Sequence, residues 1–528
     1  MFGFTVSKNG ILTDNYYKKY GYSEDPEPLG AYIMIRKIGH EIKINQDFMG
    51  SYGIYLYESK NTEYFAISNS FLLLQEYLNG KQNISFNKDF ADNLLISDLC
   101  SPLIHETLIN EITRLPSNTF LLINPEKKTL KILYIDYKEN TIPFESEEGI
   151  KLIDSWVDKW GYILRSLKNK TNNIYADLSG GFDTRSVLSM LLNSGVNLSQ
   201  ILVNSAMDNV HGHDEDFKIA NEIASKFGFK LNNFTLNKDK IRWGSKNTLS
   251  CTMYSKLGFH KEFYLKESFY NVPRFGISGS GGEIIRGATN CPINEYVKSI
   301  SSKAKNIIGH ENEFFNSSMR ICNRSIEILK DRKTFNNDFE ISLYFYSKGR
   351  ARNHFGTSSV EAFIANIYIL QPLMDPDLIK LKYNINRNLS HDLISYLYVR
   401  FGKGLINFPF EGNRNINLES IKKSIILNSK ISPFKTKSDY NSYFFIDNMR
   451  KCPEFESNDK KDSNIYLREY FNSSKFKEII NKIYDNNIYN WAKKYSYTTN
   501  FFPWRHYYGL LAISTILGNI SFIKDIIK

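Results

Sequence analysis

The sequence predicts an α+β sandwich in residues 1–146, followed in residues 147–528 by an α/β domain that ends in a helical part. Short β-branched and aromatic runs, separated by Gly, Asn, Lys and Asp, dominate the first part. Between residues 149 and 236 strand-like and helix-like segments alternate, which favours a parallel sheet covered by helices on both faces. After residue 256 the pattern is mostly helical.

Composition places the chain among ordinary globular proteins. Hydrophobic residues make up 42% of the 528 positions and charged residues 23%. The formal net charge of +11 would suit an acidic partner. The chain has no dense Lys/Arg run and no known nucleic-acid module, however, so we expect scattered surface charge and no nucleic-acid partner.

Cysteine use and hydropathy favour a cytoplasmic protein. The five cysteines are widely spaced and form no C-x-x-C, so neither disulfides nor a cysteine zinc site is expected. No basic stretch followed by an apolar run opens the chain, so we expect no signal peptide. The most apolar late segment, residues 507–523, is interrupted by Ser514, Asn519 and Ser521, which favours a core helix over a membrane span.

The first part reads as strands joined by short loops. A helix is expected at residues 71–78 and helical structure at 87–110. The polar connector at residues 143–148 marks the domain boundary. The expected strands are residues 32–36, 42–45, 52–57, 64–68, 120–124 and 130–134.

The second part opens with an amphipathic helix at residues 149–167, in which apolar residues recur every three or four positions. Further helices are expected at 186–192 and 217–227. The strands between them are residues 173–178, 201–205 and 231–236. Ligands of such sheets sit at the carboxyl ends of the strands, and residues 179–183 follow the first of these strands directly.

Ser179, Gly180 and Gly181 form a tight turn between that strand and its helix. Backbone N–H groups and the helix dipole favour an anion there, and glycine lets the backbone approach a phosphate closely. Asp183 would repel a phosphate unless Mg²⁺ lies between them. The spacing is not that of a Walker loop. The alternative is an ordinary loop in which Asp183 caps the helix.

A second glycine-rich stretch spans residues 274–287, and again a short apolar strand precedes the glycines. Glu283 follows them as a second carboxylate. Two facing carboxylates are what a Mg²⁺–triphosphate complex needs. Alone, this stretch fits an exposed loop equally well, but the ordered pair of loops about 95 residues apart is a stronger signal.

These two stretches resemble the two loops of the asparagine-synthetase family. Its synthetase domain carries S-G-G-x-D-S and, downstream, S-G-E-G-x-D-E, which stand here as residues 179–184 and 278–284. The first is also similar to the loop with which ATP pyrophosphatases grip the leaving pyrophosphate.

Three further segments are similar to the family in the same order. Residues 44–55 resemble R-D-P-L-G-x-x-P-L-Y, residues 112–118 resemble I-x-x-L-P-P-G, and residues 359–375 resemble G-x-E-x-R-x-P-F-L-D. The resemblance covers most of the chain. It implies a degenerate class II glutaminase-like (Ntn-type) domain in residues 1–146 and a PP-loop ATP pyrophosphatase domain in residues 147–528.

The resemblance also implies a site for ATP and Mg²⁺. Asp183 and Glu283 match the family's two Mg²⁺-binding carboxylates, and Ser205 lies near its adenine-side strand. The remaining nucleotide-binding positions are Ser179, Gly180, Gly181, Thr184, Ser278 and Gly279.

Two basic residues are candidates for catalysis. Lys435, with Lys437 next, is the best match for a family lysine that stabilises the transition state, and the alternative is a solvated loop lysine. Arg185 is expected either to touch a phosphate or the substrate carboxylate, or to form a surface ion pair. Residues 211–216 are rich in metal-ligand types, but Asp214 or Asp216 is better explained as a helix cap.

Departures from the family pattern carry functional information. The family's glutaminase nucleophile is a cysteine at position 2, where this chain has Phe2, and the next cysteine is Cys100. The N-G-E-I-Y-N segment that binds glutamine is not visible. We therefore expect no glutamine hydrolysis and a structural role for the first domain. Ser280 and Ile284 replace acidic positions of asparagine synthetases, which disfavours asparagine synthesis.

The resemblance implies an ATP-dependent ligase that adenylates a carboxylate and then forms an amide, similar to β-lactam synthetase and lasso-peptide cyclases. The substrate would be a small-molecule, peptide or glycan carboxylate. The nitrogen would come from an amine, from free ammonia or from a pathway partner protein. Two alternatives stay open: a nucleotide-binding pseudoenzyme or scaffold, and, less favoured, a tRNA-modifying PP-loop enzyme.

Overall fold

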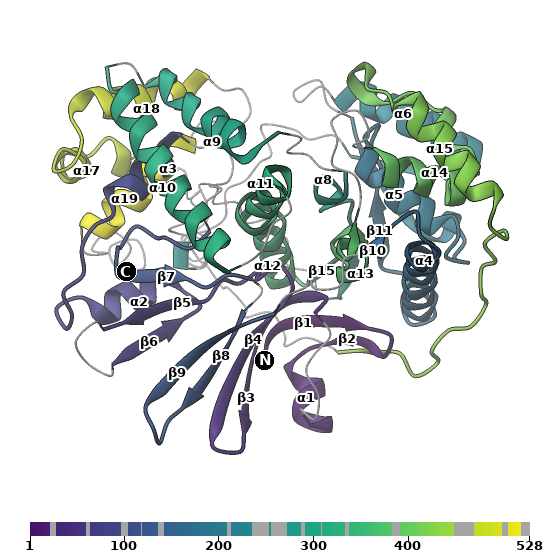
Figure 1. Ribbon diagram of the computed structural model, residues 1–528, viewed down its shortest axis with the longest axis horizontal. Helices are drawn as coiled ribbons and strands as arrows, with labels where there is room; N and C mark the ends of the chain where they lie inside the picture. The colour runs from purple at the N-terminus through teal and green to yellow at the C-terminus, as the bar shows by residue number, and fades with distance from the viewer. Residues whose placement is uncertain are drawn as a thin grey trace.

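The computed structural model has a mixed α/β architecture, in which a five-stranded parallel sheet, a seven-stranded mixed sheet, two smaller sheets and two groups of helices make up one molecule (Figure 1). It describes residues 1–21, 28–59, 64–96, 104–117, 119–135, 142–207, 213–234, 253–254, 272–286, 291–307, 309–332, 337–382, 391–447, 469–498 and 505–518. No helix within these ranges is both long and apolar enough to cross a membrane.

The expected parallel sheet is confirmed, and it has five strands. Its order is β13-β12-β11-β14-β15, and every neighbouring pair is parallel. Along the chain, β12 and β13 are added on one side of β11, and β14 and β15 are then added on its other side. The strand order therefore reverses between β11 and β14. The strands are β11 (Ile174–Asp177), β12 (Leu202–Ala206), β13 (Leu231–Phe234), β14 (Arg274–Ile277) and β15 (Ile367–Leu370).

The helices beside this sheet form because their apolar residues recur at helical spacing. Helix α4 (Glu147–Lys168) starts at Ser146, whose side chain accepts a hydrogen bond from the Gly149 N–H, and buries Trp156 and Trp160. Helix α6 (His213–Phe227) was expected to start at residue 217. Helix α5 (Phe182–Leu191) begins four residues before the expected Ser186, so Asp183 lies in its first turn.

A seven-stranded sheet dominates the first part of the chain, with the order β17-β2-β1-β3-β4-β8-β9. A three-stranded sheet, β6-β5-β7, packs on it through a shared apolar cluster that includes Ile33, Ile44, Leu56 and Leu121. The first part of the chain therefore contains two sheets that pack against each other. The strands are β1 (Phe2–Ser7), β2 (Gly10–Leu12), β3 (Gly30–Ile38), β4 (Glu41–Gln46), β5 (Tyr55–Glu58), β6 (Phe65–Ser68), β7 (Ile112–Arg114), β8 (Thr119–Asn124), β9 (Thr129–Tyr134) and β17 (Phe445–Ile446).

The edge strand β17 was not expected, because its partner lies far away in the sequence. It pairs in parallel with β2, and Asp447 follows it directly. The Asp447 carboxylate accepts hydrogen bonds from the backbone N–H groups of Thr13 (3.2 Å) and Tyr16 (2.9 Å) at the start of helix α1 (Asp14–Tyr20). A late residue therefore caps the first helix of the chain.

The remaining helices form two groups, and α3, α10, α17, α18 and α19 gather on one side of Figure 1 while α14 and α15 lie beside α4, α5 and α6 on the other. A two-stranded parallel pair joins β10 (Ile142–Pro143) to β16 (Leu381–Lys382). The helices are α2 (Phe71–Leu78), α3 (Lys88–Ile96), α8 (Gly282–Ile285), α9 (Ile293–Ser301), α10 (Glu311–Arg332), α11 (Asp338–Tyr346), π-helical η4 (Ser347–Gly356), α12 (Thr357–Ile364), α13 (Pro376–Ile379), α14 (Asp392–Phe401), α15 (Leu418–Ser429), α17 (Ser474–Ile480), α18 (Asn486–Thr498) and α19 (Arg505–Leu517).

The first part of the chain shares its apolar cores with the second. One core joins Phe71 and Leu94 to side chains of α10 and α19, such as Ile321 and Leu511. Another brings Phe4 into the cluster that surrounds the parallel sheet. The residues before position 147 therefore pack against later elements over a continuous interior.

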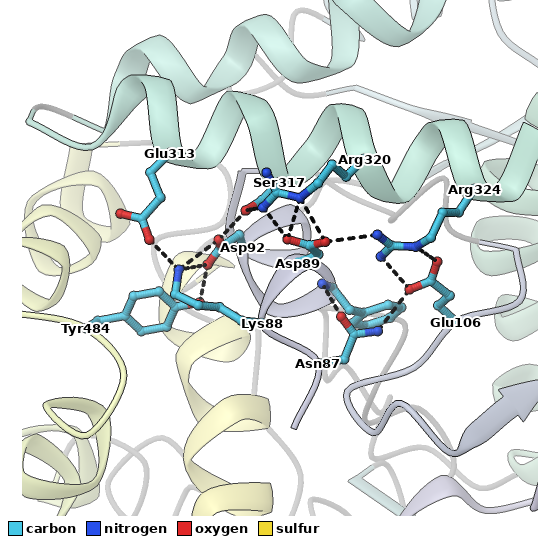
Figure 2. A network of polar contacts seen from close by, with 11 residues as sticks. Asn87, Lys88, Asp89, Asp92, Glu106, Glu313, Ser317, Arg320, Arg324 and Tyr484 are labelled. Atoms are coloured by element: carbon cyan, nitrogen blue, oxygen red, sulfur yellow. Dashed lines mark hydrogen bonds and ion pairs between the residues drawn. The ribbon is translucent and has the colours of Figure 1, made fainter. Parts of the chain in front are cut away.

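A polar network reinforces the same junction between α3, α10 and the segment after α17 (Figure 2). Asp92 is fully buried and accepts hydrogen bonds from Lys88, Ser317 (2.7 Å) and the Tyr484 hydroxyl (2.6 Å). Burial raises the pKa of Asp92, so these donors are what make its charge tolerable in the interior. Arg324 adds two-point contacts to Glu106, at 2.8 and 2.9 Å.

Replacing Tyr484 with Phe should destabilise this junction. The change leaves the buried Asp92 oxygen without its hydroxyl donor, and we expect a loss of about 1.5–3 kcal/mol, the range for hydrogen bonds to charged groups. Tyr489→Phe is the matched control, because the Tyr489 hydroxyl donates to a neutral carbonyl, that of Phe471, and its loss should cost about 1 kcal/mol. Urea unfolding followed by tryptophan fluorescence compares the two, and equal midpoints would contradict the prediction.

Candidate functional site

The two glycine-rich loops meet where the strand order of the parallel sheet reverses. The first follows β11 and the second follows β14, and these strands are direct neighbours. Such a reversal leaves a crevice at the carboxyl ends of the strands, where α/β sheets bind ligands. Here the crevice is a cavity of about 340 Å³, within the size range of small-molecule sites. It is lined by Asp177, Ser179, Gly181, Phe182, Asp183, Thr184, Ser278, Gly279, Ser280, Glu283, Arg286, Phe355, Glu411 and Arg414.

Hydroxyl groups organise the first loop. The Thr184 hydroxyl accepts a hydrogen bond from the Ser179 N–H (3.0 Å) and lies 3.1 Å from the Ser179 hydroxyl. The Ser179 hydroxyl in turn accepts from the Gly181 N–H (3.1 Å). Gly181 is the N-cap residue of helix α5 and has no side chain that could cap it. The positive end of this helix therefore faces the cavity without a capping side chain.

The Gly180 N–H differs from its expected role as a donor to a ligand. It donates instead to the carboxylate of Asp216, at 2.6 Å. Asp216 lies in the first turn of α6, so it does not cap that helix as the sequence suggested. The reason is that a half-buried N–H needs an acceptor, and the neighbouring helix supplies one. The carboxylate of Asp216 therefore already occupies this N–H donor of the first loop.

The second loop depends on glycines that let it approach α5. A Cβ on Gly279 would lie 2.8 Å from the Thr184 nitrogen, and a Cβ on Gly282 would lie 2.2 Å from the Asp183 carboxylate. Gly281 has a φ of +91°, which favours glycine. The hydroxyl groups of Ser278 and Ser280 lie 2.7 Å apart and form a hydrogen bond with each other. The second loop therefore brings Glu283 to the same cavity as Asp183.

Asp183 and Glu283 are two carboxylates in one partly enclosed space. Burial raises the pKa of Asp183, and the pKa of Glu283 is raised by burial and then by the negative charge of Asp183. Arg286 partly offsets this, because its guanidinium Nε lies 3.0 Å from Asp183 Oδ1 and its Nη2 lies 3.5 Å from Oδ2. Two such carboxylates attract a cation.

The sequence did not single out several lining residues. Arg286 lies three positions after Glu283, a helical spacing that could have drawn attention to it. Glu411 and Arg414 form an ion pair, and Arg414 lies over the Phe182 ring, 5.5 Å from its centroid. Phe355 comes from the π-helical segment η4. These last three belong to no recognisable motif, so only the fold brings them to the cavity.

Arg185, a candidate for catalysis, does not line the cavity, and because it is buried it is not part of a surface ion pair. Its side chain is fully buried, with the guanidinium 4.0 Å from the Phe410 ring centroid. It donates to the backbone carbonyls of Gly180 (2.9 Å), Phe408 (3.2 Å) and Pro409. Burial lowers the pKa of Arg185 to about 10. Arg185 therefore fastens the first loop to the segment before Glu411 and acts as a positioning residue.

Lys435, the other candidate for catalysis, also lies away from the cavity. It is exposed, and its neighbour Thr436 donates to the Asn193 carbonyl (3.2 Å), just beyond the C-terminal end of α5. The cavity lies at the opposite end of this ten-residue helix, about 15 Å away at 1.5 Å per residue. Lys437 pairs with Asp158 of α4, at 2.7 Å. The solvated-lysine alternative describes this segment better.

Ser205 and Ile284, which the sequence also singled out, do not line the cavity. Ser205 is buried at the carboxyl end of β12, and its hydroxyl forms no hydrogen bond within the described residues, although it does not line the cavity. Ile284 packs in an apolar cluster with Phe48, Tyr346 and Met374. His211 lies outside the described residues.

The residues of the cavity fit a divalent cation bound to a polyphosphate. Two carboxylates, Asp183 and Glu283, would hold the cation, which needs only one or two protein oxygens when phosphates supply others. The start of α5, which no side chain caps, is where the first loop can accept a phosphate oxygen, whereas the Gly180 N–H already donates to Asp216. No group of three or more His, Cys, Asp or Glu side chains that could hold a metal occurs in the described ranges, so an all-protein metal cage is not part of this fit.

Comparison with known proteins adds no relative. The chain matches no protein-family model, and no curated protein matches it significantly.

Replacing Arg185 separates a positioning role from a catalytic one. Arg185→Gln removes donors from buried carbonyls, so we expect a loss of about 3 kcal/mol in the free energy of unfolding. Lys435→Gln, an exposed substitution, should change stability by less than about 0.5 kcal/mol. Thermal unfolding of the two variants tests this. An Arg185→Gln variant as stable as the wild type would contradict the positioning role.

Proposed function

We propose that the protein is an ATP-dependent amide-forming ligase of the asparagine-synthetase kind. One observation carries this proposal: two glycine-rich loops with the family's spacing converge at the reversal of a parallel sheet and bring Asp183 and Glu283 into one cavity. Neither loop alone is specific, but their meeting at a ligand-binding crevice is what a nucleotide-activating site requires.

In the proposed reaction, an oxygen of the substrate carboxylate attacks the α-phosphorus of ATP. The bond to the β-phosphate breaks, and pyrophosphate leaves toward the Ser179 and Thr184 hydroxyls and the start of α5. An amine then attacks the acyl carbon, an amide forms and AMP departs. A divalent cation bound by the two carboxylates would supply charge neutralisation for the phosphates.

The attack of the amine on the acyl carbon needs a group that accepts the amine proton, and Ser280 cannot be that group. Ser280 carries a hydroxyl that lies on Ser278, so it offers no carboxylate. Asp177 and Glu411 also line the cavity, and Glu411 is already paired with Arg414. Asp177 and Glu411 are therefore the carboxylates, besides Asp183 and Glu283, that line the cavity and can accept the amine proton.

The nitrogen source in this proposal is external: an amine, free ammonia or a partner protein. Of the two cysteines in the described residues, Cys322 is fully buried, and burial raises its pKa to about 12, so it is no nucleophile at neutral pH. The substrate is a carboxylate on a small molecule, a peptide or a glycan. The site of reaction is the cytoplasm, where ATP is abundant.

A nucleotide-binding scaffold is the second candidate. It is favoured by the loss of acidic groups at Ser280 and Ile284, the latter now part of an apolar cluster. A scaffold would bind nucleotide without converting it. The two candidates therefore differ in one measurable product, pyrophosphate.

Incubation with Mg·ATP and candidate carboxylates should release AMP and pyrophosphate. Asp183→Asn and Glu283→Gln should each lower this release at least about a hundredfold, since each removes a charge that faces the phosphates. Lys435→Gln is the control and should retain full activity. Nucleotide binding without any AMP across a broad carboxylate panel would favour the scaffold.

Glutamine should not serve as the nitrogen donor of the isolated protein. Pure protein incubated with glutamine should release no glutamate, with or without ATP, because no activated thiol is assigned to the first part of the chain. A coupled glutamate dehydrogenase assay measures this directly. Glutamate release above that of a boiled control would contradict the proposed external nitrogen source.

A further inference from the structure

The cavity already contains a cation of its own at the carboxylate proposed to hold the metal. Arg286 caps the C-terminal end of α8, and its side chain is about one-fifth exposed. Its guanidinium contacts both oxygens of Asp183, at 3.0 and 3.5 Å, so the contact is two-pronged. Arg286 therefore competes with a metal for the Asp183 oxygens.

The surroundings of this pair limit where Arg286 can go. Glu283 lies one helical turn before Arg286 and is itself buried beside Asp183. Arg286 is the guanidinium that acts on both carboxylates, while Arg414 also acts on Asp183 and Arg350 also acts on Glu283. If a bare divalent cation displaced Arg286, the guanidinium would lose the Asp183 carboxylate, and the cation would bring no anion to replace it. If the cation arrived with a triphosphate, phosphate oxygens would replace the lost partner.

We infer that Arg286 makes the cavity selective for a divalent cation that arrives in complex with a triphosphate, by holding Asp183 until a phosphate takes over its guanidinium. The planar guanidinium suits this exchange, because it forms the same two-point contact with a carboxylate and with a phosphate. Arg286 is therefore a specificity-determining residue of the proposed nucleotide site. The inference rests on the proposed function for the identity of the triphosphate.

The test measures binding and needs no turnover. Free Mn²⁺ is titrated into the protein and followed by electron paramagnetic resonance, and ATP affinity is measured by calorimetry at saturating Mn²⁺. In Arg286→Gln we expect free Mn²⁺ to bind about fivefold tighter or more, because Asp183 is released. We expect ATP to bind about tenfold weaker, because a phosphate contact is lost.

Two further variants separate charge from geometry. Arg286→Lys keeps the charge but loses the planar fork, so free Mn²⁺ should bind as weakly as in the wild type while ATP affinity still falls. Arg320 of α10 forms a similar two-point pair with Asp89 of α3, outside the cavity. Arg320→Gln breaks this pair and should change neither affinity. Thermal unfolding verifies that each variant is folded.

The outcomes are distinguishable. If the wild type binds Mn·ATP and Arg286→Gln leaves the affinity for free Mn²⁺ unchanged or lowers it, the role of Arg286 is overturned and the proposed function stands. If the wild type binds no nucleotide with any divalent cation, the proposed function and this inference both fall. Opposite shifts of the two affinities in Arg286→Gln support the inference.

Discussion

The close approach of Gly282 to Asp183 is the constraint on which the rest of the candidate site depends. A side chain at position 282 would collide with the carboxylate, since even a Cβ would lie 2.2 Å from it. Because that position is glycine, the start of α8 can lie against the start of α5. Glu283 and Arg286 then reach the same cavity as the first loop. The meeting of Asp183 with Glu283 and Arg286 therefore depends on this one close backbone approach.

The sequence was sufficient for the parts of the fold that local pattern determines. The helix at 71–78, four of the five parallel strands and both glycine turns were expected, because apolar spacing and glycine position encode them directly, whereas β15 lies in a region that was expected to be mostly helical. Asp183, Glu283 and the hydroxyls of the first loop lie together for the same reason. The class of architecture was thus predictable, and the family and its activity remain proposals.

What the sequence could not supply is the direction and partner of single side chains. Arg185 follows the first loop, yet the fold turns it inward onto three carbonyls. Lys435 was chosen by a short pattern, and the fold places it beyond the far end of α5. Asp216 and Glu411 approach the first loop from other elements, and the local sequence pattern does not predict such contacts. Tertiary packing decides these roles, as it decides which edge β17 joins.

That edge has a consequence for how the protein is made. Strand β2 and the start of α1 are near the beginning of the chain, but the strand that covers them and the Asp447 carboxylate that satisfies their N–H groups are separated from Thr13 by 434 residues. During synthesis on the ribosome the edge of the seven-stranded sheet must therefore wait, uncovered, for most of the chain to emerge. Such an edge is a natural contact point for a chaperone, and it makes the final closure of the sheet one of the last events of folding.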